Sequence, residues 1–194
     1  MSQLWLADQL WVSRRTPEQR HFQQIENDPG MGIKPRGGLW TSTYRPGEDA
    51  GSGWVEWCLG EQWGVPSDYR WKAWLFKIPP RMQIYRIDTY EDLRRLVESS
   101  FGIGGPGRAL HSGGLGIDYA KMARAYDAIH LTENGQWETR LSHPHTLYGW
   151  DCESVLWLHW PWAAGEVIDL GWQEWGKPAQ PSTRHRLRRA RRDL

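Results

Sequence analysis

Cysteine is scarce in this 194-residue chain, which contains only Cys58 and Cys152. A disulfide framework and a cysteine-based zinc site both require several cysteines at short, regular spacing, so the sequence predicts neither. A long continuous apolar run is absent, and so is an N-terminal basic region followed by an apolar segment. We therefore expect no membrane-spanning helix and no standard secretion signal, and the cytoplasm is the default location.

Signatures of several enzyme classes are also absent. The chain has no Gly-Lys-Ser/Thr phosphate-binding loop, so nothing supports phosphoryl transfer of the kind that uses this loop. It also has no Gly-x-Ser-x-Gly elbow, so nothing supports a serine hydrolase of that type. The glycines of residues 102–107 are spaced as in a dinucleotide-binding fingerprint, but they follow a predicted helix, whereas that motif follows a strand. We interpret residues 101–116, which include seven glycines, as a mobile loop.

His143, His145 and Asp151 come nearest to a metal-binding pattern. Their side chains can ligate zinc, but a proline separates the two histidines and no pair of cysteines accompanies them. The pattern favours a surface loop, and no metal is predicted.

Tryptophan is the residue that the chain has in excess, with 15 among its 194 residues. The indole ring is large, is rarely buried completely, and combines an apolar surface with one hydrogen-bond donor. We expect most of these rings to replace aliphatic side chains in the core and the others to line a groove. The length fits a single domain with a substantial core.

The net charge of +1 conceals an uneven distribution. Residues 182–194 contain six arginines and a single acid, Asp193, so the remainder of the chain is mildly acidic. The composition predicts disorder for residues 177–194, which leaves residues 1–176 as one domain. Basic tails bind the phosphates of nucleic acid in some proteins and only increase solubility in others, and both interpretations remain open.

Periodicity and capping signals predict a mixed α+β domain of about seven strands and several short helices. Strands are expected within residues 4–13, 39–44, 72–78, 83–88, 127–131, 153–159 and 166–170. Helices are expected after the capping residues Thr16, Ser52, Thr89 and Asp118, the first reaching residue 27 and the second reaching residue 64. Residues 133–135 are predicted to form a turn. The strands and helices do not alternate as in a doubly wound sheet.

The stretch 37–44, with the sequence Gly-Gly-Leu-Trp-Thr-Ser-Thr-Tyr, is the strongest candidate for a ligand site. Two glycines allow the close approach of another backbone or of a ligand. In a strand, Trp40, Ser42 and Tyr44 lie on one face and Thr41 lies on the other, because side chains alternate. A ring beside hydroxyl groups suits a ligand that joins an aromatic ring to a ribose or a phosphate. An ordinary core strand with one polar edge is the alternative.

Two segments resemble parts of ADP-ribosyltransferase domains, the superfamily of the poly(ADP-ribose) polymerases and of bacterial toxins. The first comprises residues 37–42, followed by Ser52 and the pair Trp57-Cys58, and the second comprises residues 152–157. In poly(ADP-ribose) polymerase-like members the first segment forms the nicotinamide pocket. A strand similar to the second segment opens with the catalytic glutamate of the family.

The resemblance implies a split two-sheet fold that holds NAD⁺ in a cleft, and an enzyme that transfers ADP-ribose from NAD⁺ to a macromolecular acceptor, either protein or nucleic acid. Glu153 would be the catalytic carboxylate, which binds the nicotinamide ribose and stabilises the positive charge that develops as nicotinamide leaves. A glutamate that simply begins a surface strand is the alternative. The residues expected to bind NAD⁺ are Arg14, Gly38, Trp40, Thr41, Ser42, Tyr44 and Ser52.

The sequence departs from the family at two points. The family places a histidine or arginine on its first strand, whereas the first predicted strand has neither, so Arg14 at its end is the nearest candidate, with His21 behind it. Arginine-modifying members have Glu or Gln two residues before the catalytic glutamate, where this chain has Asp151, so the acceptor stays open. A non-catalytic module remains the alternative function, with exposed tryptophans that stack on bases or sugars and a basic tail that assists.

Overall fold

A computed structural model describes residues 6–28, 34–101 and 116–177 of the chain. The mobile loop predicted at residues 101–116 lies almost wholly outside these ranges, and the arginine-rich residues 182–194 lie wholly outside them. Within the described residues, no helix is both long enough and apolar enough to cross a membrane.

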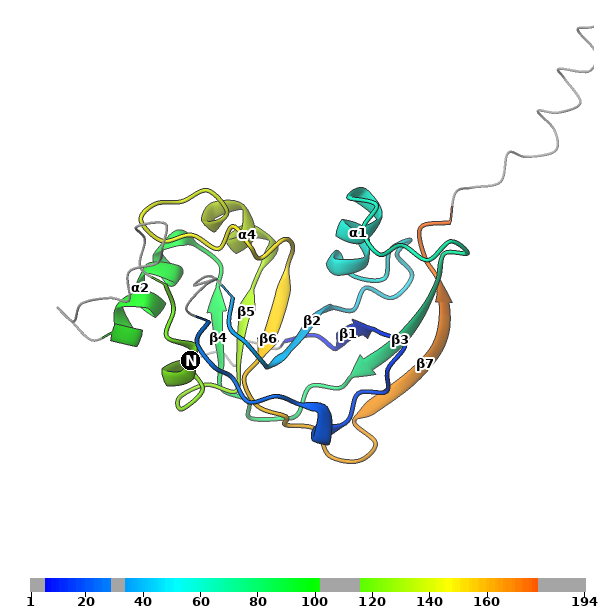
Figure 1. The fold of residues 1–194 in the computed structure, drawn as a ribbon, viewed down its shortest axis with the longest axis horizontal. Helices are drawn as coiled ribbons and strands as arrows, with labels where there is room; N and C mark the ends of the chain where they lie inside the picture. The colour runs from blue at the N-terminus through cyan, green and yellow to red at the C-terminus, as the bar shows by residue number, and fades with distance from the viewer. Residues whose placement is uncertain (1–5, 29–33, 102–115, 178–194) are drawn as a thin grey trace, which may run out of the picture.

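Seven strands form one mixed sheet across the middle of the molecule (Figure 1). They are β1 (Gln9–Val12), β2 (Leu39–Thr43), β3 (Arg70–Phe76), β4 (Ile84–Ile87), β5 (Ala128–Leu131), β6 (Ser154–Trp157) and β7 (Val167–Glu174). Their order is β4-β5-β6-β2-β1-β3-β7, and β4 and β5 are parallel. The predicted α+β content with about seven strands is confirmed, whereas the expected split into two sheets stays a prediction.

β2 joins the two halves of the sheet and pairs with its two neighbours through different parts of its length. Residues 39–41 pair with β6, whereas Ser42 and Thr43 pair with β1. Each neighbour therefore leaves part of β2 outside its ladder. At the end of β2 that lies beyond the β6 ladder, the hydrogen bonding of Ser42 and Thr43 is completed by a side chain. The candidate site is built at this end.

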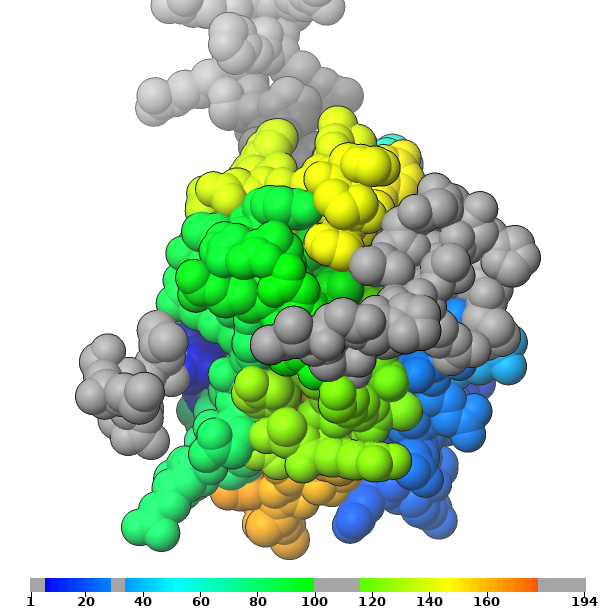
Figure 2. Space-filling view, turned by 90° about the vertical axis from the view of Figure 1, so that its left-hand side faces the viewer, coloured from blue at the N-terminus to red at the C-terminus, as the bar shows by residue number. Residues whose placement is uncertain are grey.

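Helices cover the two halves of the sheet unequally. The α-helices are α1 (Gly53–Gly60), α2 (Tyr90–Phe101), α3 (Tyr119–Met122) and α4 (Glu133–Thr139). Among the described residues, α2, α3 and α4 surround the β4-β5-β6 half, and α1 is the α-helix of the other half (Figure 1). On the outer side of the first half, α2 lies between α3 and the segment that follows α4 (Figure 2).

Capping residues determine where several helices begin. The side chains of Ser52 and Asp118 accept hydrogen bonds from backbone N–H groups in the first turns of α1 and α3, as predicted. The Thr89 hydroxyl likewise accepts from the backbone at the start of α2. α1 ends at Gly60 rather than near Gly64.

The helix expected after Thr16 is wrong. A single 3-10 turn, Gln19–His21, forms instead, and the chain then runs extended. Glu26 and Arg36 exchange two backbone hydrogen bonds of 3.0 and 2.9 Å across an isolated bridge. Because a helix would withdraw these backbone groups from the bridge, the long-range pairing outweighs the local capping signal.

The turn predicted at residues 133–135 is also wrong, since these residues begin α4. The Thr132 hydroxyl caps the helix by accepting from the Gly135 N–H at 3.0 Å. A Cβ at Gly135 would lie 2.2 Å from the carbonyl oxygen of Ile87. The glycine therefore allows α4 to pack closely on the end of β4, and it does not mark a turn.

The two halves also differ in their cores. The cluster beneath α2 and α3 is mainly aliphatic and includes Ile87, Leu93, Leu96, Val97, Ile129 and Leu131. The two other clusters contain the buried tryptophans Trp71, Trp74, Trp157, Trp162 and Trp175. Trp71, Trp74 and Trp175 lie on or next to strands with less helical cover, whereas Trp157 belongs to β6 and Trp150 to the mainly aliphatic cluster.

Candidate functional site

Glu153 stands directly before β6, where the ladder between β2 and β6 ends. The last residue pair of this ladder joins Thr41 to Val155. Beyond it, the backbone N–H of Thr43 donates to Oε2 of Glu153 at 2.9 Å. A side-chain oxygen thus replaces the backbone carbonyl that a regular antiparallel ladder would supply. The carboxylate is therefore fixed at the join between the two halves of the sheet.

Both carboxylate oxygens of Glu153 have two hydrogen-bond partners. In addition to the Thr43 N–H, Ser42 Oγ lies 2.8 Å from Oε2. Thr43 Oγ1 and His130 Nε2 lie 2.8 and 2.9 Å from Oε1. A carboxylate has about four acceptor positions, and Glu153 is only 6% exposed. The group is therefore buried, and its acceptor positions are filled by the protein.

The pKa of Glu153 lies below its ordinary value. Burial by itself favours the neutral acid and raises the pKa, but the hydrogen bond and Coulomb interaction with His130, and the hydrogen bonds from Thr43 and Ser42, outweigh it. Glu153 is consequently ionised at neutral pH. A buried carboxylate that stays charged and immobile is suited to stabilise positive charge on a neighbouring group.

The N-terminus of α1 orients the Ser42 hydroxyl. The backbone N–H of Trp54 donates to Ser42 Oγ at 3.2 Å, and the hydroxyl proton has two acceptors on Glu153, Oε2 at 2.8 Å and the backbone carbonyl oxygen at 3.0 Å. A Cβ at Gly53 would lie 3.4 Å from the same oxygen, so the helix begins in contact with Ser42. The relay of hydrogen bonds from the α1 backbone through Ser42 links the helix to Glu153.

One side of Glu153 faces an open cavity of about 560 Å³, which we call the polar cavity; its lining includes Thr43, Arg45, His130, Glu133 and Glu153. Arg45 forms ion pairs with Glu48, with Glu56 of α1 and with Glu133 of α4. Burial lowers the pKa of Arg45, but the carboxylates of Glu133, Glu48 and Glu56 raise it above its ordinary value. Arg45 is thus a fixed cation that bridges α1 and α4 above Glu153.

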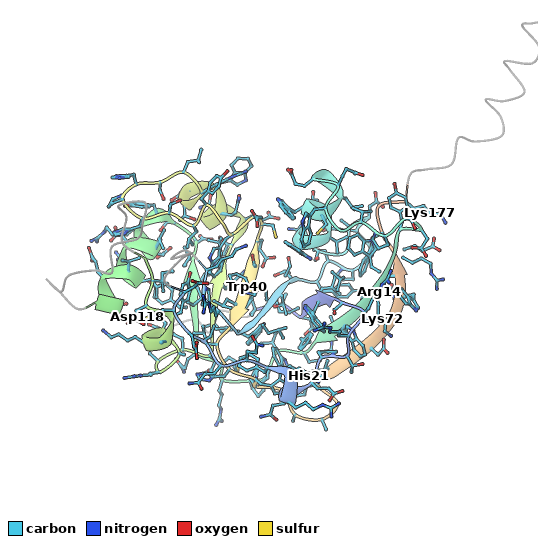
Figure 3. The ribbon with its side chains drawn as sticks, viewed as in Figure 1. Arg14, His21, Trp40, Lys72, Asp118 and Lys177 are labelled. Atoms are coloured by element: carbon cyan, nitrogen blue, oxygen red, sulfur yellow. The ribbon has the colours of Figure 1, made fainter. Side chains whose placement is uncertain are left out.

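Ser42 also lines a second cavity, of about 410 Å³, which we call the aromatic cavity. Its lining includes five tryptophans, Trp11, Trp40, Trp54, Trp63 and Trp150. Trp40 lies near the middle of the molecule (Figure 3), and Lys34 Nζ lies 5.6 Å from its ring centroid and 3.3 Å from Asp151 Oδ2. The volume is that of a small-molecule site, and the lining can hold a planar ring beside a half-buried charge pair.

Three of the residues predicted to bind NAD⁺, Trp40, Thr41 and Ser42, line the aromatic cavity. The Thr41 hydroxyl is already engaged, because it donates to Gln9 Oε1 at 3.0 Å and accepts from Trp157 Nε1 at 2.8 Å. Ser42 is the member of this group that is hydrogen-bonded to Glu153. The structure thus brings the two segments of the resemblance together through Ser42.

The other predicted residues lie elsewhere. Ser52 caps α1, and Tyr44 packs against the apolar cluster beneath it. A Cβ at Gly38 would lie 2.8 Å from the Leu156 side chain, so this glycine allows two chain segments to pack closely. Arg14 lines a third cavity, beside β3 (Figure 3).

Two residues that hold Glu153, His130 and Thr43, are not among those predicted from the sequence. His130 is the one polar side chain of the short strand β5, and an ionisable residue in such a strand is a usable signal. Thr43 follows Ser42 in β2, and simple alternation places its side chain on the opposite face of the strand. The side chains of Ser42 and Thr43 nevertheless both reach Glu153, because its carboxylate lies past the end of the β2-β6 ladder and can be contacted from either face of the sheet.

Neither cysteine is activated as a nucleophile. Burial raises the pKa of the Cys58 thiol to about 11. Burial, together with the charge of Glu153, raises the pKa of Cys152 to about 12. Both thiols therefore stay protonated at neutral pH, and Cys152 lines the aromatic cavity as a neutral group.

No protein family, curated protein or solved structure shows a significant match to the chain.

Proposed function

We propose that the protein cleaves NAD⁺ and transfers its ADP-ribose to an acceptor, with Glu153 as the catalytic residue. The observation that carries the proposal is a buried, ionised glutamate that is hydrogen-bonded to Ser42, a residue that lines a tryptophan-lined cavity. The resemblance of residues 37–42 and 152–157 to ADP-ribosyltransferase domains supports the same assignment.

The chemistry needs a fixed negative charge. When the bond between nicotinamide and ribose breaks, its electron pair leaves with nicotinamide, and positive charge develops on C1′ and the ring oxygen of the ribose. An immobile carboxylate stabilises this charge more strongly in the transition state than in the ground state. The nucleophile of the acceptor then bonds to C1′ and loses a proton, and water takes its place when no acceptor is bound. The hydrogen bonds that keep Glu153 ionised suit it to this task.

The aromatic cavity would receive the nicotinamide ring. Trp40 packs edge-on against Trp150, with ring centroids 4.5 Å apart, which restrains one wall of the cavity. In this proposal, the nicotinamide ring stacks on the indoles, and Lys34 can contact a phosphate when its ion pair with Asp151 opens. The finer assignment of a split fold belongs to the same proposal, since the short pairing between β1 and β2 is where the two halves would separate.

The filled carboxylate sets a condition on this mechanism. A ribose hydroxyl can bind Glu153 only if it displaces one of the present partners. We expect His130 to give way, because its imidazole borders the polar cavity and lies on a different strand from Ser42 and Thr43. The same observation favours the second candidate function, a non-catalytic tryptophan-rich binding module, in which Glu153 only joins β2 to the start of β6.

Nicotinamide release from NAD⁺ separates the two functions. We expect the full-length protein to release nicotinamide, and the Glu153→Gln variant to do so at least 100-fold more slowly, a barrier increase of about 2.7 kcal/mol. Glu153→Asp retains the charge but withdraws it by about 1 Å, and should also lose on the order of 100-fold. Glu61→Gln, which changes an exposed glutamate after α1, is the matched control and should cleave at the wild-type rate.

Circular dichroism establishes that each variant is folded before its rate is interpreted. If the wild-type protein releases no nicotinamide, either alone or with cell extract as a source of acceptors, the transferase proposal fails. It fails equally if both Glu153 variants are fully active.

A further inference from the structure

A third cavity, which we call the basic groove, lies where β1, β3 and β7 meet the segment after α1. Its volume is about 520 Å³. The charged residues that line it are Arg14, Arg70 and Lys72, and no aspartate or glutamate is among its described lining residues. Its tryptophans are Trp54, Trp63, Trp71 and Trp172. The groove therefore combines positive charge with indole rings.

The positive charge of the groove is largely uncompensated. Among the described residues, neither Arg14 nor Arg70 forms an ion pair, whereas Lys72 pairs with Asp169. Lys177, the last described residue, lies on the same side of the molecule as Arg14 and Lys72 (Figure 3). This side of the protein therefore attracts anionic ligands.

Two indoles of the groove are exposed to an unusual degree. Trp63 is 58% exposed and Trp172 is 50% exposed. The Arg70 guanidinium lies 5.5 Å from the centroid of the Trp172 ring. An exposed indole next to a guanidinium offers a stacking surface and a phosphate contact in the same place, the combination that single-stranded nucleic acids require.

The basic groove adjoins the aromatic cavity. Val12, Trp54 and Trp63 line both cavities, and Ser42 links the aromatic cavity to Glu153. A base that stacks on Trp63 would therefore lie beside the cavity in which we place the nicotinamide ring.

We propose that the basic groove binds single-stranded nucleic acid, with phosphates on Arg14 and Arg70 and bases stacked on Trp63 and Trp172. A single strand fits better than a duplex because its bases are free to stack, and better than an acidic peptide because a peptide carboxylate makes no use of the exposed rings. The identification of this strand as the acceptor of ADP-ribose rests on the proposed function, whereas the binding itself does not.

Fluorescence anisotropy with the full-length protein tests the binding. The probes are labelled DNA and RNA single strands of about 12 nucleotides, a length within the usual site sizes, and NAD⁺ is absent. We expect Trp172→Ala to weaken binding about tenfold through lost stacking. Arg70→Gln should weaken it and reduce the slope of log affinity against log salt by about 0.7, the effect of one lost phosphate contact.

Matched controls come from the opposite half of the sheet. Trp137→Ala removes a 76% exposed tryptophan of α4, and Arg124→Gln removes an exposed arginine after α3. Both should bind the strand as the wild type does, and thermal unfolding shows that all four variants are folded. Unchanged affinity in both groove variants, equal losses in groove and control variants, or equal affinity for a duplex of the same sequence would each overturn the proposal.

NAD⁺ is the competing occupant, because it also carries bases and phosphates. If the groove variants lose affinity for NAD⁺ and keep their affinity for the oligonucleotide, the groove holds half of NAD⁺ and the nucleic-acid proposal is wrong. Nicotinamide release without nucleic acid tests the transferase separately. If the protein cleaves NAD⁺ but the groove variants bind the strand normally, only this inference is wrong. If the protein does not cleave NAD⁺ but the groove variants lose binding, only the proposed function is wrong.

Discussion

The two halves of the sheet bury their surfaces with different side chains. The β4-β5-β6 half is surrounded by three α-helices among the described residues, and its core is mainly leucine, isoleucine and valine, with Trp150 and Tyr119 as its fully buried aromatic side chains. The β1-β3-β7 half has one α-helix among the described residues, and its neighbouring clusters are rich in tryptophan. Small aliphatic side chains fill space closely between helices and a sheet, whereas large rings cover a surface that lacks helices and leave gaps between them. Both tryptophan-lined cavities adjoin the second half.

We therefore expect the first half to contribute most of the stability, the second half to carry the proposed basic groove, and the proposed NAD⁺ site to lie at the join between the halves. Truncation of a buried aliphatic side chain in the first half should then reduce stability, whereas truncation of an exposed indole in the second half should affect ligand binding more than stability.

Truncation of one buried and one exposed side chain tests the comparison directly. Leu96 of α2 is fully buried, so Leu96→Ala should reduce the free energy of unfolding by about 2–5 kcal/mol through lost burial and a cavity. Trp63→Ala removes a larger but mostly exposed ring that contacts Trp54 and Trp57, and should reduce stability by only about 1 kcal/mol. Urea unfolding at neutral pH measures both. A loss for Trp63→Ala as large as that for Leu96→Ala would contradict the comparison.

A lower pH should weaken the hydrogen bonds of the Glu153 carboxylate, which lie where the two halves of the sheet meet. Because the pKa of Glu153 is lower in the folded protein than in the unfolded chain, the unfolded state binds more protons as the pH falls. The stability from Glu153 is therefore fully present above the unfolded carboxyl pKa and is lost as the pH falls through the folded pKa. We expect the difference in free energy of unfolding between the wild type and Glu153→Gln to shrink as the pH is lowered from 7 toward 3. Urea titrations across that range measure it, and a constant difference would show that the carboxylate does not titrate as described.

Loss of the Ser42 hydroxyl should moderately reduce both the stability of the protein and its affinity for NAD⁺. Ser42→Ala removes the hydrogen bond to Glu153 and the acceptor for the Trp54 N–H, so we expect stability and NAD⁺ affinity each to fall by about 1 kcal/mol. Ser99→Ala, which removes an exposed hydroxyl that donates only to the Leu96 carbonyl within α2, is the control and should leave NAD⁺ affinity unchanged. Calorimetric titration with NAD⁺ and thermal unfolding are the measurements. An unchanged NAD⁺ affinity in a stable Ser42→Ala protein would remove Ser42 from the proposed site.

Deletion of residues 182–194 should have the smallest effect on catalysis. We expect nicotinamide release to be unchanged, because the candidate site is built from residues before 178. Affinity for an oligonucleotide and its salt dependence should both decrease if the six arginines contact phosphates. An unchanged salt dependence after deletion would show that these arginines do not bind nucleic acid.

Local sequence signals correctly predicted those features that depend on contacts within one turn of the chain. The caps at Ser52 and Asp118 depend on side chains and N–H groups within one turn, and both were predicted. The errors at residues 17–27 and 133–135 have a different origin. There, pairing with Arg36 and close packing on Ile87 outweigh the local preference, and neither contact is visible in a short window of sequence.

By itself, the sequence determined the α+β class, most strand positions, and the position of Glu153 at the start of an apolar strand. The tertiary structure alone decided that Ser42, Thr43 and His130 converge on its carboxylate. These residues come from strands far apart in the chain, so they meet only when β2 and β5 both lie beside β6. The charge state of Glu153 also depends on the tertiary structure. Burial raises its pKa and hydrogen bonding lowers it, and the balance between them is set only when the strands are assembled.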